Sequence, residues 1–353
     1  MSKITHVAGN FIIQADGAFL NGAGLSDGVN RNVTVPKSLR VGNNRYPYVS
    51  AQSWRRWLRN TVCEEAGWQP SELRTIKSSE KGSSSKISGG LNPIDFPEDD
   101  IFGYMRSAEG QGKVKESLIP EDEGEENDDM PTKTASKSKV KALIRTSPFM
   151  SSILISIRNN CITKDDGFVH LKEGSPLPYS TEFYYTDLQG VFCLDYSRLG
   201  KFANIGDKIE LDELLLKRED IIVNDGIYEL KNRDIIRKER ASSLLKALAV
   251  LRGGAKMAAF GGDVSPKVIV AAGLSCGNPI FNNVFVEDGA KVKINIELLK
   301  ELAFDYKDRL ITKIFIGVRT GYLSNENDLE LLNKEFFEVT TPLKAMEKLS
   351  GEL

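Results

Sequence analysis

The feature that most constrains the fold of this chain is a long polar segment, residues 67–141, between two stretches with core-forming patterns. Residues 77–90 are rich in Ser, Lys and Gly, and residues 121–129 (EDEGEENDD) place seven acids in nine positions. Such compositions are typical of disordered loops, because they bury too little apolar surface to offset the entropy of ordering. The core must therefore come from residues 1–66 and 142–353, with a partly disordered insertion between them.

Regular patterns on both sides of the insertion predict an α+β fold. Apolar runs, alternation and helical spacing predict strands at residues 5–14, 152–158, 183–196, 267–274 and 313–318, and helices at residues 51–65, 235–252 and 297–307. Gly253 is expected to terminate the second helix as its C′ glycine. The order strand–helix–(insertion)–strand–strand–helix–strand, followed by a C-terminal extension, is the ferredoxin-like order that RNA-recognition modules use.

Composition excludes several classes of protein. The hydrophobic content of 41% and the charged content of 27% are those of a soluble globular protein. No apolar run approaches the roughly 20 residues that span a bilayer, and no signal sequence is evident, so we expect a cytoplasmic protein without a membrane partner. The four cysteines are scattered without CxxC spacing, which predicts free thiols and neither a disulfide framework nor a metal site. No cofactor is expected.

Residues 28–63 form a basic segment in a chain whose formal net charge is −2. This segment holds seven Lys or Arg and no Asp or Glu, with Tyr and Trp interleaved. A local excess of positive charge with aromatic residues is the electrostatic pattern of a polyanion-binding site.

The basic segment ends in a predicted helix that begins after Ser50. Ser50 is a good N-cap, and Gln52, Arg55 and Arg59 share one face of the helix. Basic residues in a first turn oppose the helix dipole, and a phosphate bound at the N-terminus would remove that conflict. The alternative is a solvated amphipathic helix whose arginines only keep it soluble.

Two further patterns could carry chemistry. The glycine-rich stretch 253–262, which contains Lys256, could cradle phosphates or could be a flexible helix-to-strand loop. It matches neither nucleotide-binding glycine motif. Asp165-Asp166-Gly167 could bind a metal but is explained more simply as a turn within an otherwise loop-like region, residues 159–182. No nucleophile triad is supported, so no catalytic residue is predicted.

Three segments together resemble a known family. They are the loop from Asn21 to Lys37, the stretch YPYVSAQSWRRWLR at residues 46–59, and residues 190–260, which run from GVFCLDYSRL to GGAKMAAF. In this order they are similar to the CRISPR-associated RAMP-superfamily backbone subunit of type I Cascade, the Cas-seven family, and most closely to its DevR-like, type I-B branch.

The resemblance implies a hand-shaped protein with an RRM-like palm formed by residues 1–66 and 142–353. Residues 67–141 would be inserted helical fingers, and residues 159–182 or thereabouts a β-hairpin thumb. Copies would stack head-to-tail along a CRISPR guide RNA, beside other Cascade subunits, and present the spacer bases to target DNA. The implied function is structural and not enzymatic.

The resemblance and the basic segment together predict the RNA-binding residues. Met150 would brace a flipped base, and the apolar residues Phe168, Val169 and Leu171 would form the wedge of the thumb. The full predicted set is Lys37, Arg40, Ser50, Gln52, Arg55, Arg56, Arg59, Met150, Phe168, Leu171 and Lys256. Two alternatives remain open: a type III-like ribonuclease that cuts RNA with Asp165 or Asp166, and a single-strand RNA-binding module that acts alone.

Overall fold

The structure is a computed structural model that describes residues 3–25, 33–71, 74–77, 85–88, 91–106, 142–170, 172–206 and 208–353. The acidic run at residues 121–129 and Leu171 lie outside the described residues, so the predictions that concern them stay predictions. Among the helices that the structure describes, none is long and apolar enough to cross a bilayer.

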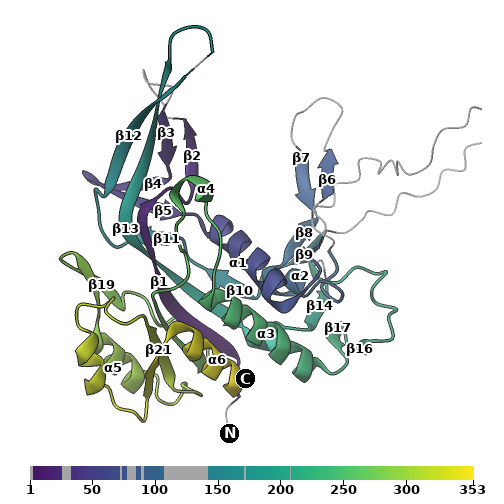
Figure 1. Ribbon diagram of the computed structural model, residues 1–353. Helices are drawn as coiled ribbons and strands as arrows, with labels where there is room; N and C mark the ends of the chain where they lie inside the picture. Colours follow the sequence, from purple (N-terminus) through teal and green to yellow (C-terminus); the bar gives the residue numbers. More distant parts are fainter. Residues whose placement is uncertain are drawn as a thin grey trace, which may run out of the picture.

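A large sheet forms the centre of the molecule (Figure 1). Its central strands, each antiparallel to its neighbours, are in spatial order β18 (Val268–Leu274), β1 (His6–Ala18), β13 (Leu177–Asp195) and β11 (Leu154–Ser156). The chain passes from β1 to β11 through α1 (Ala51–Ala66) and from β13 to β18 through α3 (Arg233–Ala249). This is the split βαβ arrangement that the sequence predicts, and the α+β fold class is confirmed.

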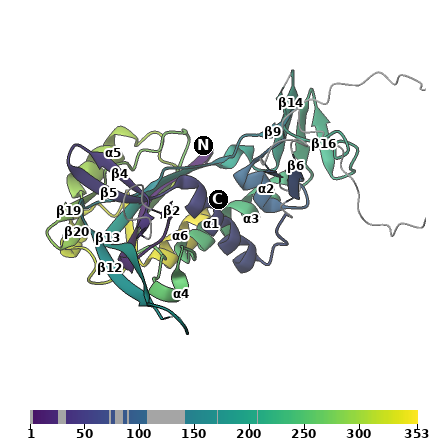
Figure 2. The same cartoon turned by 90° about the horizontal axis from the view of Figure 1, so that it is seen from above.

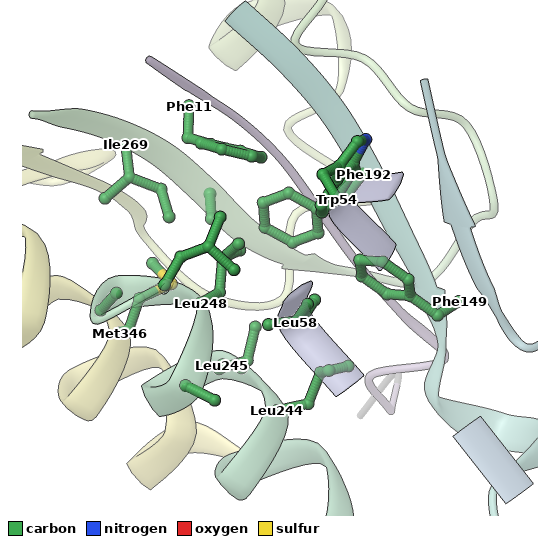
Figure 3. Close-up of a cluster of buried hydrophobic side chains, with 14 of the residues drawn as sticks. Phe11, Trp54, Leu58, Phe149, Phe192, Leu244, Leu245, Leu248, Ile269 and Met346 are labelled. Carbon is green, nitrogen blue, oxygen red and sulfur yellow. The ribbon is translucent and has the colours of Figure 1, made fainter. Parts of the chain in front are cut away.

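One face of the sheet carries the core that packs against α1, α3 and α6 (Pro342–Glu352). Phe11 and Trp54 meet edge to face with ring centroids 5.4 Å apart, and Trp54 meets Phe149 at 5.7 Å. The indole Nε1 of Trp54 donates to the carbonyl oxygen of Ser152 at 2.7 Å. Ser152 lies between two short strands, β10 (Phe149–Ser151) and β11, whereas the sequence predicts a single strand over residues 152–158. Figure 3 shows these rings together with Leu58, Phe192, Leu244, Leu245, Leu248, Ile269 and Met346.

The C-terminal extension covers the opposite face of the sheet (Figure 2). Its elements are β19 (Phe285–Asp288), β20 (Lys291–Ile294), α5 (Ile296–Asp305), β21 (Ile314–Val318) and β22 (Phe337–Thr340). β21 and β22 extend the sheet beyond β18, while α5 and the β19–β20 hairpin pack on it. The face that an ordinary RNA-recognition module leaves open is thus largely buried here.

A β-hairpin lies at residues 159–182, where the resemblance implies one, although the local sequence pattern alone is loop-like. β12 (Ile162–Val169) pairs with the first part of β13, which continues without interruption into the central sheet. The predicted turn at residues 165–167 is wrong, because these residues lie inside β12. There the carboxylate of Asp166 accepts a hydrogen bond from Ser180 across the hairpin, and the ring of Tyr179 lies over Gly167, where a Cβ would come within 2.6 Å of it.

A second, smaller sheet lies beside the main one and was not predicted. Its strands are, in order, β16 (Ile221–Asn224), β17 (Ile227–Leu230), β14 (Lys201–Ile205), β15 (Lys208–Ile209), β9 (Leu143–Arg145) and β8 (Tyr104–Arg106). β8 belongs to the insertion, while the other strands come from the segments expected in the palm. The described part of the insertion also contains β6 (Arg74–Lys77), β7 (Ser85–Ser88) and the six-residue helix α2 (Pro97–Phe102).

A buried ion network fastens the insertion to the rest of the molecule. Asp100 of α2 has no exposed surface and pairs with Arg145 through one carboxylate oxygen and with Arg240 at 2.6 Å through the other. Arg145 also reaches Glu210 at 3.3 Å. These residues come from α2, β9, α3 and the loop after β15, so their charges join four separate segments.

The second helix ends earlier than the sequence predicts. α3 stops at Ala249 with Val250 as its C-cap, so the expected C′ role of Gly253 is wrong. Gly253 has φ +149 and lies against Trp57 of α1, where a Cβ would come within 2.3 Å of the ring. Close packing against α1, and not helix termination, explains this glycine.

Candidate nucleic-acid interface

The N-terminus of α1 lies beside Asn21 and Lys37, residues distant from it in sequence. Ser50 caps the helix, its Oγ accepting from the amide of Ser53 at 3.4 Å, as predicted. Asn21 Oδ1 accepts from the Ser50 amide at 2.9 Å, and the Asn21 carbonyl accepts from the Lys37 amide at 2.8 Å. Asn21 therefore fixes Lys37 and the helix cap next to one another.

The glycine-rich loop adds Lys256 to this region. The amide of Ala255 donates to the Leu20 carbonyl at 3.0 Å, which places the loop next to Asn21. Lys256 has φ +52, an uncommon backbone conformation for a residue other than glycine, and its Nζ donates to Thr181 Oγ1 at 3.2 Å. The same Nζ lies 4.8 Å from the ring centroid of Phe19. These contacts order the loop around Lys256, and its phosphate contact stays a prediction.

Lys37, Arg40 and Arg56 are the predicted cations that remain available. Arg40 is exposed and lies near the end of β4 (Ser38–Val41). β4 forms a hairpin with β5 (Asn44–Val49). Arg56 and Gln52 are exposed on one face of α1, beside a hollow of about 360 Å³ between α1 and Phe102. Within the residues that the structure describes, none of these three cations has an ion pair.

Arg55, in contrast, lines the same hollow but is half-buried and hydrogen-bonded within the chain. Its guanidinium donates to the carbonyl oxygens of Phe149 and Phe102, the latter at 3.1 Å, and to Ser147 Oγ at 2.8 Å. It lies 5.6 and 5.7 Å from the ring centroids of Phe102 and Phe149. Burial, and then the nearby charge of Arg59, lower the pKa of Arg55. These contacts hold β10, and with it Met150, in place.

Arg59 is also paired within the chain. Its Nη2 lies 2.6 Å from Asp99 Oδ1 and 3.5 Å from Glu98 Oε1, two carboxylates with at most 1% exposure. Glu98 Oε1 additionally accepts from the amide of Ser71. Arg59 thus neutralises buried acids of α2, in an insertion for which the sequence indicates no contact with α1. This ion pairing gives Arg59 a structural role. A contact of Arg59 with phosphate stays a prediction.

Neighbouring arginines on α1 provide a matched pair for a test. We expect Arg55→Ala to lower the free energy of unfolding by about 2–3 kcal/mol, because two carbonyls lose a charged donor. We expect Arg56→Ala to change it by less than about 0.5 kcal/mol. Arg56→Ala should instead reduce the log–log salt slope of RNA binding by about 0.7, the loss of one contact to single-stranded RNA. Urea denaturation and salt titration measure the two quantities. A stable Arg55→Ala variant with the reduced slope would instead show that Arg55 contacts a phosphate, as the sequence predicts.

The remaining predicted residues are exposed and lie far apart along β13. Met150 is 46% exposed and Phe168 is 63% exposed. Met150 lies opposite Cys193, Lys256 bonds to Thr181, and Phe168 lies opposite Pro178. Fifteen residues separate the first and last of these levels, which is roughly 50 Å of strand. Met150 and Phe168 of one chain therefore cannot contact the same nucleotide. β13 is long enough for an extended strand of nucleic acid to lie along it.

Sequence reasoning missed several residues that shape this region. Arg45 Nη2 lies 2.8 Å from Glu182 Oε2, an ion pair that joins β5 to the base of the hairpin. Phe19 and Thr181 position Lys256. Arg45 belongs to the basic segment, but its acidic partner lies more than a hundred residues away, so no local pattern could distinguish it from its unpaired neighbours.

Comparison with known proteins identifies only structural relatives. No family model matches the sequence, and no curated protein matches it. A chain of a solved structure described as "CRISPR RNA-guided surveillance complex" is 12% identical, with a TM-score of 0.50 and coverage of 98% of this chain and 99% of that chain. A second, described as "CRISPR RNA-guided surveillance complex, pre-nicking", is 11% identical, with a TM-score of 0.55 and coverage of 99% and 100%. At these identities the similarity concerns the fold.

Proposed function

We propose that this chain is the guide-RNA-binding backbone subunit of a type I Cascade surveillance complex, of the DevR-like, type I-B branch, and that it does not cut RNA. The observation that carries the proposal is the convergence of Lys37 and the Ser50 helix cap, from the basic segment, with Lys256 of the glycine-rich loop, far away in sequence. Lys256 also bonds to Thr181 of β13. The fold shared with chains of surveillance complexes along their whole length supports it.

The chemistry of this region fits backbone binding without sequence reading. Lysine and arginine neutralise phosphates whatever the bases are, and free amides at a helix N-terminus favour an anion. In a guided complex, base pairing by the guide reads the target, and the protein only holds the guide in shape. The proposed partners are therefore the guide RNA, target DNA through the guide, further copies of this chain and other Cascade subunits.

Binding to guides with different spacers tests the proposal directly. We expect the protein to bind guide RNAs of unrelated spacer sequence with affinities within a factor of about three, since single-strand contacts to phosphates carry no sequence information. Native mass spectrometry should show several copies on one guide. A single copy per RNA would favour the RNA-binding module that acts alone.

Assembly along the guide is expected to depend on the apolar end of the hairpin. Phe168 and Val169 are exposed there, at 63% and 48%, and exposed apolar clusters commonly mark partner sites. We expect Phe168→Ser with Leu171→Ser to leave a soluble protein that binds short RNA but forms no regular arrays on a full guide. Electron microscopy checks the arrays, and Leu214→Ser, which changes an 86% exposed leucine elsewhere, is the control. Normal arrays from the hairpin variant would remove the hairpin end from assembly.

A ribonuclease remains the rival, and the same samples decide it. Asp165 and Asp166 are exposed on β12, and hydrogen bonds from Lys164 and then from Ser180 lower the pKa of Asp166. An ionised, exposed carboxylate could bind Mg²⁺. RNA cleavage by the wild-type protein with Mg²⁺, abolished by Asp165→Asn or Asp166→Asn, would replace the structural function by the enzymatic one.

A further inference from the structure

A second basic hollow lies on the face of the sheet opposite α1. The C-terminal extension covers most of that face but leaves a hollow of about 570 Å³. Its lining comes from the end of β1, the middle of β13, the start of β20 and the residues that flank β11, β18 and β21. None of the predicted RNA-binding residues lines it.

Four cations from four segments line this C-terminal hollow: Arg158, Lys267, Lys291 and Arg319. They face two carboxylates, Asp16 and Asp187. Two further acids beside the hollow, Asp263 and Glu287, pair with Lys267 and Arg158. Cations that stay unpaired within a concave surface concentrate the field on an anion.

Two of the four cations form ion pairs within the chain. Arg158 pairs with Asp187 and, at 3.8 Å, with Glu287, and Lys267 Nζ lies 2.5 Å from an oxygen of Asp263. Lys291 Nζ donates only to the carbonyl of Gly321, at 3.0 Å, and Arg319 is exposed. In the part of the chain that the structure describes, neither Lys291 nor Arg319 pairs with a carboxylate, so both charges are available to a ligand.

Hydrogen bonds among Arg158, Asp187 and Tyr322 hold one wall of the hollow in place. Asp187 is 7% exposed and accepts hydrogen bonds from both Arg158 and the hydroxyl of Tyr322. Arg158 also donates to the carbonyl of Ala290 at 2.9 Å, which ties the β19–β20 turn to β13. Burial, and then the charge of Asp187, raise the pKa of Tyr322, so its hydroxyl stays a donor. A wall fixed in this way loses little entropy when a ligand binds.

Tyr185 supplies an aromatic surface beside the cations. Its side chain is 56% exposed, and its ring meets Phe183 edge to face at 5.8 Å. Its hydroxyl lies against Gly17, where a Cβ would be 3.2 Å away. An exposed, supported ring next to unpaired cations is the combination that binds single strands, since bases stack on the ring and phosphates meet the charges.

We propose that the C-terminal hollow is a second binding site for single-stranded nucleic acid, with a phosphate at Lys291 and Arg319 and a base on Tyr185. The occupant is a strand other than the guide segment held beside β13. The inference rests on the hollow alone and stands whether or not the chain belongs to a surveillance complex. RNA and DNA offer the same phosphate and base chemistry, and the experiment distinguishes them.

The test uses the full chain saturated with unlabelled guide RNA and measures the anisotropy of short labelled oligo-rU and oligo-dT. We expect Lys291→Glu with Arg319→Glu to weaken binding of the preferred oligomer on the order of 20-fold at about 0.1 M salt, the loss of two phosphate contacts. Lys334→Glu with Lys344→Glu makes the same change of charge at exposed positions elsewhere and should have less than about a twofold effect. Guide binding should be unchanged in both variants.

Ultraviolet cross-linking gives an independent readout. We expect a nucleotide adduct on the peptide that contains Tyr185, absent from the Lys291→Glu, Arg319→Glu variant. Equal affinity of that variant and of its control would overturn the proposal, and so would competition by uridine monophosphate as effective as that by the oligomer. If the chain does not bind guide RNA at all, the same comparison on the free protein still tests the hollow.

Discussion

Replacing Lys37, Arg40 and Arg56 together by Ala is expected to weaken guide-RNA binding on the order of 100-fold at about 0.1 M salt. Each cation is exposed or half-buried and has no ion pair among the described residues, so each can release one phosphate counterion. Three lost contacts to single-stranded RNA should lower the log–log salt slope by about 2. The loss should be the same for all spacer sequences, because phosphate contacts carry no sequence information.

The control for this experiment removes the same charge elsewhere. Lys217, Lys334 and Lys344 are exposed and lie outside the basic segment and the glycine-rich loop, so their triple Ala variant should retain the affinity and the slope of the wild type. Thermal melting of both variants should coincide with that of the wild type, since exposed side chains contribute little packing. If both triple variants lose affinity equally, general charge and not the region around Ser50 binds the guide.

Asp100→Ala is expected to reduce the free energy of unfolding by about 3–5 kcal/mol. Asp100 has no exposed surface, and its two oxygens satisfy Arg145 and Arg240; the amide of Gly200 donates to it as well, at 2.9 Å. Removal of the carboxylate leaves two buried guanidinium groups without their partner. Chemical denaturation measures the loss.

Asp234→Ala is the matched control, because Asp234 forms an ion pair with Arg237 at 2.9 Å but is 83% exposed. Exposed pairs contribute at most about 1 kcal/mol, so the control variant should unfold near the wild-type midpoint. Similar losses in the two variants would show that the ion network is solvated and does not hold the insertion. A loss confined to Asp100→Ala, with exchange of the α2 amides increased, would locate the weakened contact.

Local patterns predicted the local structure of this chain well. Ser50 was identified as the cap of α1 because the hydrogen bond that makes it one spans three residues. The order of strands and helices was also predictable, since apolar periodicity records which side of each element is buried.

Contacts between distant segments were not predictable. Arg55 and Arg59 have the pattern of phosphate ligands, but their partners lie 39 or more residues away, at Asp99 and Phe149 among others. Glu98 and Asp100 belong to a polar insertion, where nothing in the sequence indicates burial. The sequence predicts a turn at Asp165 and Gly167 because turn propensity is local. Their strand pairing depends on residues 179–181, which lie on the other strand of the hairpin.

The uninterrupted course of β13 has a mechanical consequence. Its 19 residues belong to the hairpin at one end and lie between β1 and the β10–β11 pair at the other. A hinge within it would break ladder hydrogen bonds, so the hairpin behaves as a stiff lever fixed in the sheet and not as a pivoting arm. A force on the tip of the hairpin is therefore transmitted to the central sheet. A register slip of one residue would turn every side chain of β13 to the other face, so the register is fixed. The distance from the sheet to the tip of the hairpin is thus set by the register of a single strand.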